Sequence, residues 1–343
     1  MKRIFCTVFV LLFPFIGCAP AQAPAESKGH FGAVHCAAFS PDGKKIVTAG
    51  YDNTARIWDI ESGRELHTLL GHRGHSAGIN SVAFSPDGNK IVTAGSDGNA
   101  NVPHEPGKIG NVRIWDAETG KEIRKLEGYS WCCSSASFSP DGKKVIAAGD
   151  FTNETVFIWE VESGKVLQKL EGHKNGANVA VFSPDGRKIF TGSGNIFRIW
   201  DAETGKELQK FEAERWGDAN SAALLPNGRN IFVANRDIVR ILATEMGKNV
   251  QKIEETNRFG DNPPYLCSPD GKKIVTTNRD VIQIWDVESG KELQKFAPGF
   301  LPAAFSPDGK TILSVVDNAV TILDIESGKE LKKWTWKIHY WLN

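Results

Sequence analysis

One tetrapeptide, Ser-Pro-Asp-Gly, recurs along the whole chain and constrains the fold more than any other feature. The complete copies begin at Ser40, Ser85, Ser139, Ser183, Ser268 and Ser306. A degenerate seventh copy, Leu-Pro-Asn-Gly, begins at Leu225, so that successive copies lie 45, 54, 44, 42, 43 and 38 residues apart. A period of this length is typical of repeat architectures. An active site occurs once in a chain, so a phrase repeated seven times predicts scaffolding rather than chemistry.

Each repeat contains four segments with the character of β-strands. In the first repeat they are residues 34–39, 44–50, 55–59 and 64–70. Ser-Pro-Asp-Gly supplies a proline with a fixed φ and a glycine that tolerates positive φ, as a tight turn requires. The Trp of the third segment offers a large apolar plate to the next repeat. Four antiparallel strands in each of seven repeats predict an all-β fold, a seven-bladed β-propeller over residues 29–343.

With these Ser-Pro-Asp-Gly and Trp-Asp phrases, the chain resembles the WD40-repeat family from about residue 29 to residue 341. In that family a His, a Ser or Thr, an Asp and a Trp of one blade form a hydrogen-bonded tetrad. The resemblance implies a first tetrad of His30, Thr48, Asp52 and Trp58.

A second tetrad is implied in the second repeat, and there two histidines compete for the first place. His75 lies nine residues before Phe84, the spacing that separates His30 from Phe39, whereas His72 lies twelve before Phe84. The expected members are therefore His75, Thr93, Asp97 and Trp115.

Later repeats depart from the family pattern. Tyr129 replaces the His of the third repeat, the fourth repeat lacks the Asp, and the fifth lacks both His and Trp. Many family members close the ring with an outer strand taken from the N-terminus. Here residues 330–341 suit the outer strand of the seventh repeat, so we expect closure without strand exchange.

The N-terminus has the proportions of an export signal. Lys2 and Arg3 precede an apolar run that is too short to span a bilayer. Residues 15–18, Phe-Ile-Gly-Cys, resemble a bacterial lipobox, which would make residues 1–18 a signal peptide and Cys18 the lipid-attachment site. The alternative is simple cleavage after Ala23. Residues 19–28 are rich in Ala and Pro and predict an extended tether, so we expect an exported protein of the periplasm or cell envelope, anchored by lipid.

Four further cysteines fall inside the repeats. Cys36 and Cys267 lie in predicted strands and are expected to be packed thiols. Cys132 and Cys133 are adjacent in a predicted loop, where a vicinal disulfide is an open alternative.

Charge and motifs exclude several function classes. The 41 Lys and Arg residues balance 41 Asp and Glu residues, which argues against a general nucleic-acid binder. We found no nucleophile with a base and no phosphate-binding glycine loop. The sequence therefore predicts no enzyme, no cofactor and no metal, and favours a scaffold that binds other proteins.

Recognition is expected where the repeats vary. An insertion at residues 98–110 separates the second and third strands of the second repeat, on the same face as the variable links between repeats. The resemblance implies partner contacts at positions that WD40 proteins often use for binding, and the links between repeats add aromatic residues. Together these give a set of candidate partner-binding residues. They are His35, Tyr51, Asn80, Trp131, Asn178, Trp216, Arg236 and Arg279.

An alternative function would use a corner of the same face. His72 and His104 are ligand types that suit a metal and lie in neighbouring loops. A ligand-binding or metal-binding envelope protein, or a propeller enzyme, is therefore the competing hypothesis.

Overall fold

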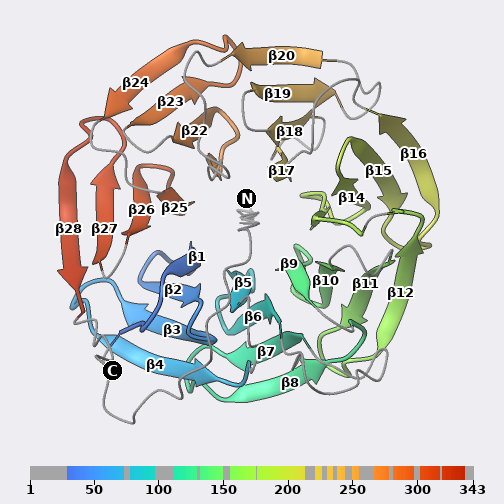
Figure 1. The fold of residues 1–343 in the computed structure, drawn as a ribbon, viewed down its shortest axis with the longest axis horizontal. Coiled ribbons are helices and arrows are strands. Elements are labelled where there is room, and N and C mark those ends of the chain that lie inside the picture. The colour runs from blue at the N-terminus through green and yellow to red at the C-terminus, as the bar shows by residue number, and fades with distance from the viewer. Residues whose placement is uncertain are drawn as a thin grey trace, which may run out of the picture.

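Four-stranded antiparallel sheets stand in a ring around a central axis (Figure 1). The structure is a computed structural model and describes residues 29–72, 78–96, 111–129, 132–149, 155–174, 176–212, 221–225, 230–234, 238–243, 249–254, 266–277, 281–296, 302–316 and 319–336. The strands within these ranges form seven sheets, numbered here as blades 1 to 7. An all-β propeller with four-stranded antiparallel blades is confirmed.

The strands follow the repeats of the sequence. Blades 1 and 2 consist of β1 (Val34–Phe39), β2 (Lys45–Gly50), β3 (Thr54–Asp59) and β4 (Glu65–Leu70), then β5 (Ile79–Phe84), β6 (Lys90–Gly95), β7 (Val112–Asp116) and β8 (Glu122–Leu126). Blades 3 and 4 consist of β9 (Cys133–Phe138), β10 (Lys144–Gly149), β11 (Thr155–Glu160) and β12 (Val166–Glu171), then β13 (Val179–Phe182), β14 (Lys188–Ser193), β15 (Ile196–Asp201) and β16 (Glu207–Glu212).

The remaining blades keep the same order. Blade 5 consists of β17 (Ser221–Leu224), β18 (Asn230–Ala234), β19 (Ile238–Ala243) and β20 (Asn249–Glu254). Blade 6 consists of β21 (Leu266–Cys267), β22 (Lys273–Thr277), β23 (Ile282–Asp286) and β24 (Glu292–Phe296), and blade 7 of β25 (Pro302–Phe305), β26 (Thr311–Val316), β27 (Ala319–Asp324) and β28 (Glu330–Thr335). In the blades whose four strands are all labelled, the first strand lies nearest the axis and the fourth on the perimeter (Figure 1).

The Ser-Pro-Asp-Gly turns join the two inner strands and also join neighbouring blades. In blade 1 the Ser40 hydroxyl donates to Asp42 Oδ1 at 2.6 Å, and Gly43 takes a φ of 70°. A Cβ on Gly43 would lie 3.7 Å from the ring of Pro307, the proline of the preceding blade's turn. The same proline–glycine contact recurs at Gly88 with Pro41 and at Gly142 with Pro86. The repeated phrase therefore packs the innermost turns against one another around the axis.

A β-bulge recurs between the third and fourth strands of all seven blades and sets up a second contact between blades. In blade 1 Trp58 pairs with Glu65 and Ile57 with His67, which leaves Leu66 as the extra residue. In five of these blades the residue after the bulge bonds a backbone carbonyl in the outer turn of the next blade. These contacts are His67 Nε2 to Glu118 O at 2.6 Å, Arg124 Nη1 to Ser163 O at 3.1 Å, Gln168 Nε2 to Glu203 O, Gln294 Nε2 to Glu326 O at 2.5 Å, and Lys332 Nζ to Glu61 O.

The apolar core lies between blades rather than within them. One cluster joins Ala37, Ile46 and Trp58 of blade 1 to residues of blade 7 such as Leu313 and Val320. Other clusters bridge blades 2 and 3 and blades 3 and 4 in the same way. Each blade therefore buries its faces only if both neighbours are present, and the ring has to close.

Blade 7 meets blade 1 without exchanging a strand, as the sequence predicted. β25–β28 and β1–β4 each pair only in chain order. Trp336, just past β28, stacks on Trp58 with ring centroids 5.3 Å apart, and its Nε1 donates to His30 O at 3.1 Å. Gly29 packs directly against the Trp336 side chain. A buried tryptophan, the Lys332 contact and the Pro307 contact together close the ring.

We expect Trp336→Ala to lower the free energy of unfolding by about 3–5 kcal/mol, because it removes a buried aromatic ring from the contact between blades 7 and 1. Deletion of residues 330–343 should destabilise the protein further by removing β28 and exposing the edge of β27. Chemical denaturation measures both effects. Leu331→Ala, at an exposed position of the same strand, is the control and should change stability by less than about 0.5 kcal/mol. Equal midpoints for Trp336→Ala and the control would contradict this account of closure.

Candidate protein-binding face

Strand topology divides the connections of the propeller between two faces. Because consecutive strands are antiparallel, the Ser-Pro-Asp-Gly turns and the turns before the outer strands share one face. The turns between second and third strands and the links between blades lie on the other, called here the link face. The link face is where the sequence is least regular, and where the insertion at residues 98–110 begins.

The four expected residues of blade 1 form one hydrogen-bonded chain beneath the link face. His30 Nδ1 lies 3.0 Å from Asp52 Oδ1, and His30 Nε2 lies 2.8 Å from Thr48 Oγ1. Trp58 Nε1 donates to the same hydroxyl at 2.8 Å. Burial alone would raise the pKa of Asp52, but the neighbouring His30 and the bonds from Thr54 and Phe31 N outweigh it and lower the pKa to about 2. Asp52 is therefore charged at neutral pH and holds the turn beside Tyr51.

In blade 2 the hydrogen-bonded set contains His72 and not the predicted His75. His72 Nε2 lies 2.7 Å from Thr93 Oγ1, and Trp115 Nε1 donates to that hydroxyl at 2.8 Å. The assignment to His75 was wrong, because counting back from Phe84 ignores the length of the link. The position is set from the other side: β4 ends at Leu70, and the next Gly-His pair follows at once, as it does after β12. His75 and Asp97 lie outside the described residues.

In blades 3 and 4 some members of this hydrogen-bonded set are replaced or missing. The Tyr129 hydroxyl donates to Ala147 O, and Trp159 Nε1 bonds Glu127 O at 3.0 Å, so a backbone carbonyl stands in for the missing hydroxyl. Blade 4 keeps its histidine: His173 Nε2 lies 2.7 Å from Thr191 Oγ1, which also accepts from Trp200. It has no counterpart of Asp52.

Three blades also contain an arginine–glutamate pair, with a largely buried arginine, that the sequence analysis missed. Arg56 Nη1 lies 2.9 Å from Glu65 Oε2, and that oxygen accepts from Gly29 N at 3.0 Å. The same pairing joins Arg113 to Glu122 and Arg198 to Glu207. The signal was present, because each Arg stands two residues before the blade Trp and each Glu opens the outer strand. These pairs hold the Gly-His segments against their own blades.

The corner of the link face over blades 1 to 3 is tightly packed at its base. Gly78 lies against blade 1 so closely that a Cβ there would be 2.5 Å from Gly50 O. Ser96, at the start of the turn that contains the insertion, pairs with Cys132 of blade 3 in an isolated bridge. Ser96 N also donates to Gly78 O at 3.1 Å, so the base of the insertion is fixed to blade 3 directly and to blade 1 through Gly78.

The predicted contact residues differ in what they present at this face. Tyr51 is 39% exposed, whereas Asn80 and Asn178 are each only 8% exposed. The Asn80 amide donates to Cys132 Sγ at 3.1 Å and to Cys133 O at 3.2 Å, so it joins blade 2 to blade 3. The remaining predictions lie outside the residues or side chains described: His35, residues 98–110, Trp131, Trp216, Arg236 and Arg279.

Cys132 and Cys133 are both reduced, and their thiols lie in separate environments. Cys133 is fully buried and its thiol donates to Ala148 O at 3.1 Å, while Cys132 Sγ accepts the Asn80 amide. Because the two sulfur atoms bond different partners, this arrangement does not favour a vicinal disulfide. Burial raises the pKa of the Cys36 thiol, which stays protonated and packed.

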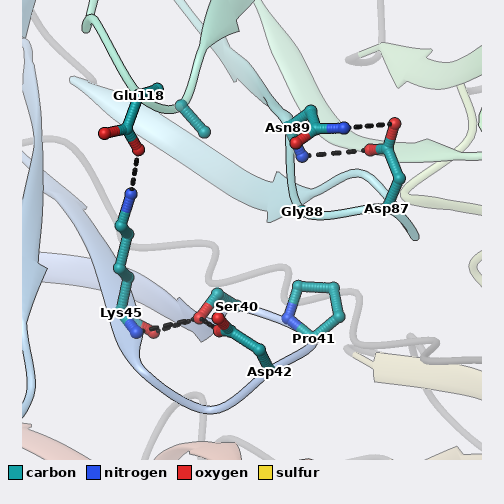
Figure 2. A pocket seen from close by; sticks show the side chains of 9 residues that line it. Ser40, Pro41, Asp42, Lys45, Asp87, Gly88, Asn89 and Glu118 are labelled. Carbon is teal, nitrogen blue, oxygen red and sulfur yellow. Dashed lines mark hydrogen bonds and ion pairs between the residues drawn. The ribbon is translucent and has the colours of Figure 1, made fainter.

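A hollow of about 440 Å³ lies on the opposite face, between the turns of blades 1 and 2 (Figure 2). Its walls include Asp42, Asp87 and the ion pair of Lys45 with Glu118 at 2.6 Å. Burial would raise the pKa of Asp42 and Asp87, but bonds from the turn serines and backbone amides lower it more. Both carboxylates are thus ionised and engaged in their turns, an arrangement suited to structure rather than to proton transfer.

Among the described residues, no group of three or more His, Cys, Asp or Glu side chains could hold a metal ion. His72, one member of the predicted metal corner, is buried and bonded to Thr93. His104 lies outside the described residues. The part of the chain described also contains no helix of the length and apolarity needed to cross a membrane.

Comparisons with known proteins agree with this geometry. The family model described as WD domain, G-beta repeat, matches residues 24–59, 63–102, 120–160 and 164–201. The chain is 29% identical over 130 residues to the small ribosomal subunit protein RACK1 of Caenorhabditis elegans, covering 35% of this chain and 34% of that one. It is 34% identical over 123 residues to the WD40 repeat-containing protein HOS15 of Arabidopsis thaliana (36% and 19%), and 23% identical over 156 residues to autophagy-related protein 16 of the same plant (38% and 31%). The matches therefore span about a third or less of each relative's length.

Substitution of each histidine in turn tests whether His72 or His75 belongs to the hydrogen-bonded set of blade 2. We expect His72→Ala to lower the free energy of unfolding by about 2 kcal/mol, because it removes a buried ring and a hydrogen bond to Thr93. His75→Ala should cost less than about 0.5 kcal/mol. Urea denaturation of both variants measures the difference. The opposite ranking would restore His75 to the tetrad.

Proposed function

The chain belongs to the WD40-repeat β-propeller family, and from that premise we propose that it is a non-catalytic scaffold that binds other proteins through its link face. Proteins of this family generally mediate protein–protein contacts. The observation that carries the proposal is the position of Tyr51: 39% exposed, and next to a charged Asp52 that is bonded to His30.

A rigid, partly exposed tyrosine suits a protein interface. Its ring buries a large area while few rotatable bonds are restrained, and tyrosine is enriched among residues that dominate binding energy. The Tyr51 turn is fixed on both sides, since Tyr51 N donates to Ala33 O at 3.0 Å and Gly78 packs against the Tyr51 backbone. We propose that partners contact Tyr51 together with residues 98–110, whose base at Ser96 is tied to blade 3.

We further propose that this platform is a complete seven-bladed ring that works in the bacterial cell envelope. The support for seven blades is the set of contacts by which Trp336, Lys332 and Pro307 join blade 7 to blade 1. The support for the location is the signal-like segment at residues 1–18 and the lipobox-like Cys18. A lipid on Cys18 and the tether at residues 19–28 would hold the propeller at a membrane surface.

The competing role of a metal-binding or ligand-binding protein receives less support. A metal held by His72 and His104 would require His72 to give up its bond to Thr93. Asp42 and Asp87, the carboxylates of the hollow on the opposite face, are bonded to the serines of their own turns. We therefore place partner binding ahead of ligand handling and catalysis.

In-cell crosslinking followed by purification of the tagged protein tests the scaffold role. The variant Tyr51→Ala with Arg236→Ala and Arg279→Ala is compared with Glu118→Ala, a control on the opposite face where the side chain is 83% exposed. We expect specific proteins to be recovered with wild type and control and to be lost with the triple variant. Equal recovery from all three would reject the link face, and recovery of no protein would reject the scaffold.

The lipid anchor has an independent test. We expect Cys18→Ser to move the protein from the membrane fraction to the soluble fraction, because the thiol that would carry the lipid is gone. Ala23→Asp, which blocks ordinary cleavage after residue 23, is the matched control and should leave the protein in the membrane fraction. The reverse pattern would favour simple cleavage.

A further inference from the structure

Blade 4 contains a histidine with only one of its two ring nitrogens hydrogen-bonded to a described residue. His173 is 0% exposed, and its Nε2 lies 2.7 Å from Thr191 Oγ1. Its Nδ1 is buried and forms no hydrogen bond among the described residues. In blade 1 the corresponding nitrogen of His30 lies 3.0 Å from the Asp52 carboxylate. Two histidines in equivalent places thus differ by one carboxylate.

The length of a turn explains the difference. In blade 1 three residues connect β2 to β3, and the middle one is Asp52. In blade 4 only Gly194 and Asn195 connect β14 to β15, and Ser193 pairs directly with Ile196. The shorter turn has no position for a carboxylate above His173.

The two charged groups that shift the pKa of His173 are both positive. Burial is the largest cause that lowers the pKa of His173 to about 4, and the positive charges of Arg198 on β15 and Lys210 on β16 lower it further. Glu207 pairs with Arg198, and Glu212 lies 3.4 Å from Lys210. The inner strand β13 is Val-Ala-Val-Phe and contains no charged residue. On β14 the only charged residue is Lys188, at the far end of the strand. Glu171 and Lys174 lie on either side of the Gly172–His173 pair in the sequence.

We propose that His173 is an acid-sensitive lock: uptake of a proton by its ring releases the segment from Gly172 to Lys174 from blade 4, while the paired His30 keeps blade 1 closed. A protonated ring needs an acceptor at both nitrogens, and the described residues offer none at Nδ1. Gly172 O is held by Arg198 Nη2 at 2.7 Å, so release of the ring also disturbs the arginine beside it.

The direction of the effect follows from proton binding. The opened segment exposes a histidine with an ordinary pKa of about 6.5, so between that value and about 4 the opened form binds more protons than the closed form. The closed form, in which residues 172–174 pack on blade 4, is therefore most stable at and above pH 7, and its stability relative to the opened form decreases as the pH falls. With these two values the opening equilibrium rises about 20-fold from pH 7 to pH 5.

Amide hydrogen exchange at pH 7 and pH 5, corrected for intrinsic rates, tests the lock. We expect protection of residues 172–174 to fall about 20-fold in the intact protein. Protection around His30, the internal reference, should change much less. A matching decrease at both sites would reject a specific role for His173, and no decrease at residues 172–174 would reject the lock.

Two variants separate the titration of His173 from general acid loosening. His173→Gln keeps a donor toward Thr191 but does not titrate, and should abolish the pH response of residues 172–174. Lys210→Gln removes a half-exposed cation and leaves the ring in place, so the response should be smaller than in wild type. A wild-type response in Lys210→Gln would contradict the proposed electrostatics, even if His173→Gln failed to fold.

Discussion

Every blade of this propeller depends on contact with its two neighbours. The apolar clusters bridge adjacent blades, and in five of the Ser-Pro-Asp-Gly turns the proline packs against the glycine of the next turn. A linear row of such units would leave two apolar faces in water. The contact between blades 7 and 1, centred on Trp336, is therefore the one on which the whole ring depends.

Blades 7 and 1 are joined by the same two kinds of contact that join other neighbouring blades, and in addition by Trp336. Lys332 bonds the turn of blade 1 as His67 bonds the turn of blade 2, and Pro307 meets Gly43 as Pro41 meets Gly88. Trp336 is the addition, because blades 7 and 1 are not joined by a link. A buried aromatic ring supplies the attachment that the peptide chain supplies between the other blades.

The division of labour between the two faces follows from the same architecture. Repeated turns on one face pack blade against blade, and their carboxylates are engaged there. On the link face the loop sequences can vary, because buried hydrogen bonds such as those of His30 and Trp58 to Thr48 fix the residues beneath the loops. Blade 4 shows the consequence of losing one member: its histidine is kept, but no carboxylate accompanies it.

The sequence by itself determined the fold class, the order of strands and the four partners of blade 1, because each is written in a short repeat with its own period. Tertiary structure alone decided that His72 and not His75 bonds Thr93, since that choice depends on where β4 ends in space. It also decided that Asn80 joins two blades and that His173 lacks a carboxylate. Such contacts depend on which groups meet across a blade boundary, and a one-dimensional spacing does not contain that distance.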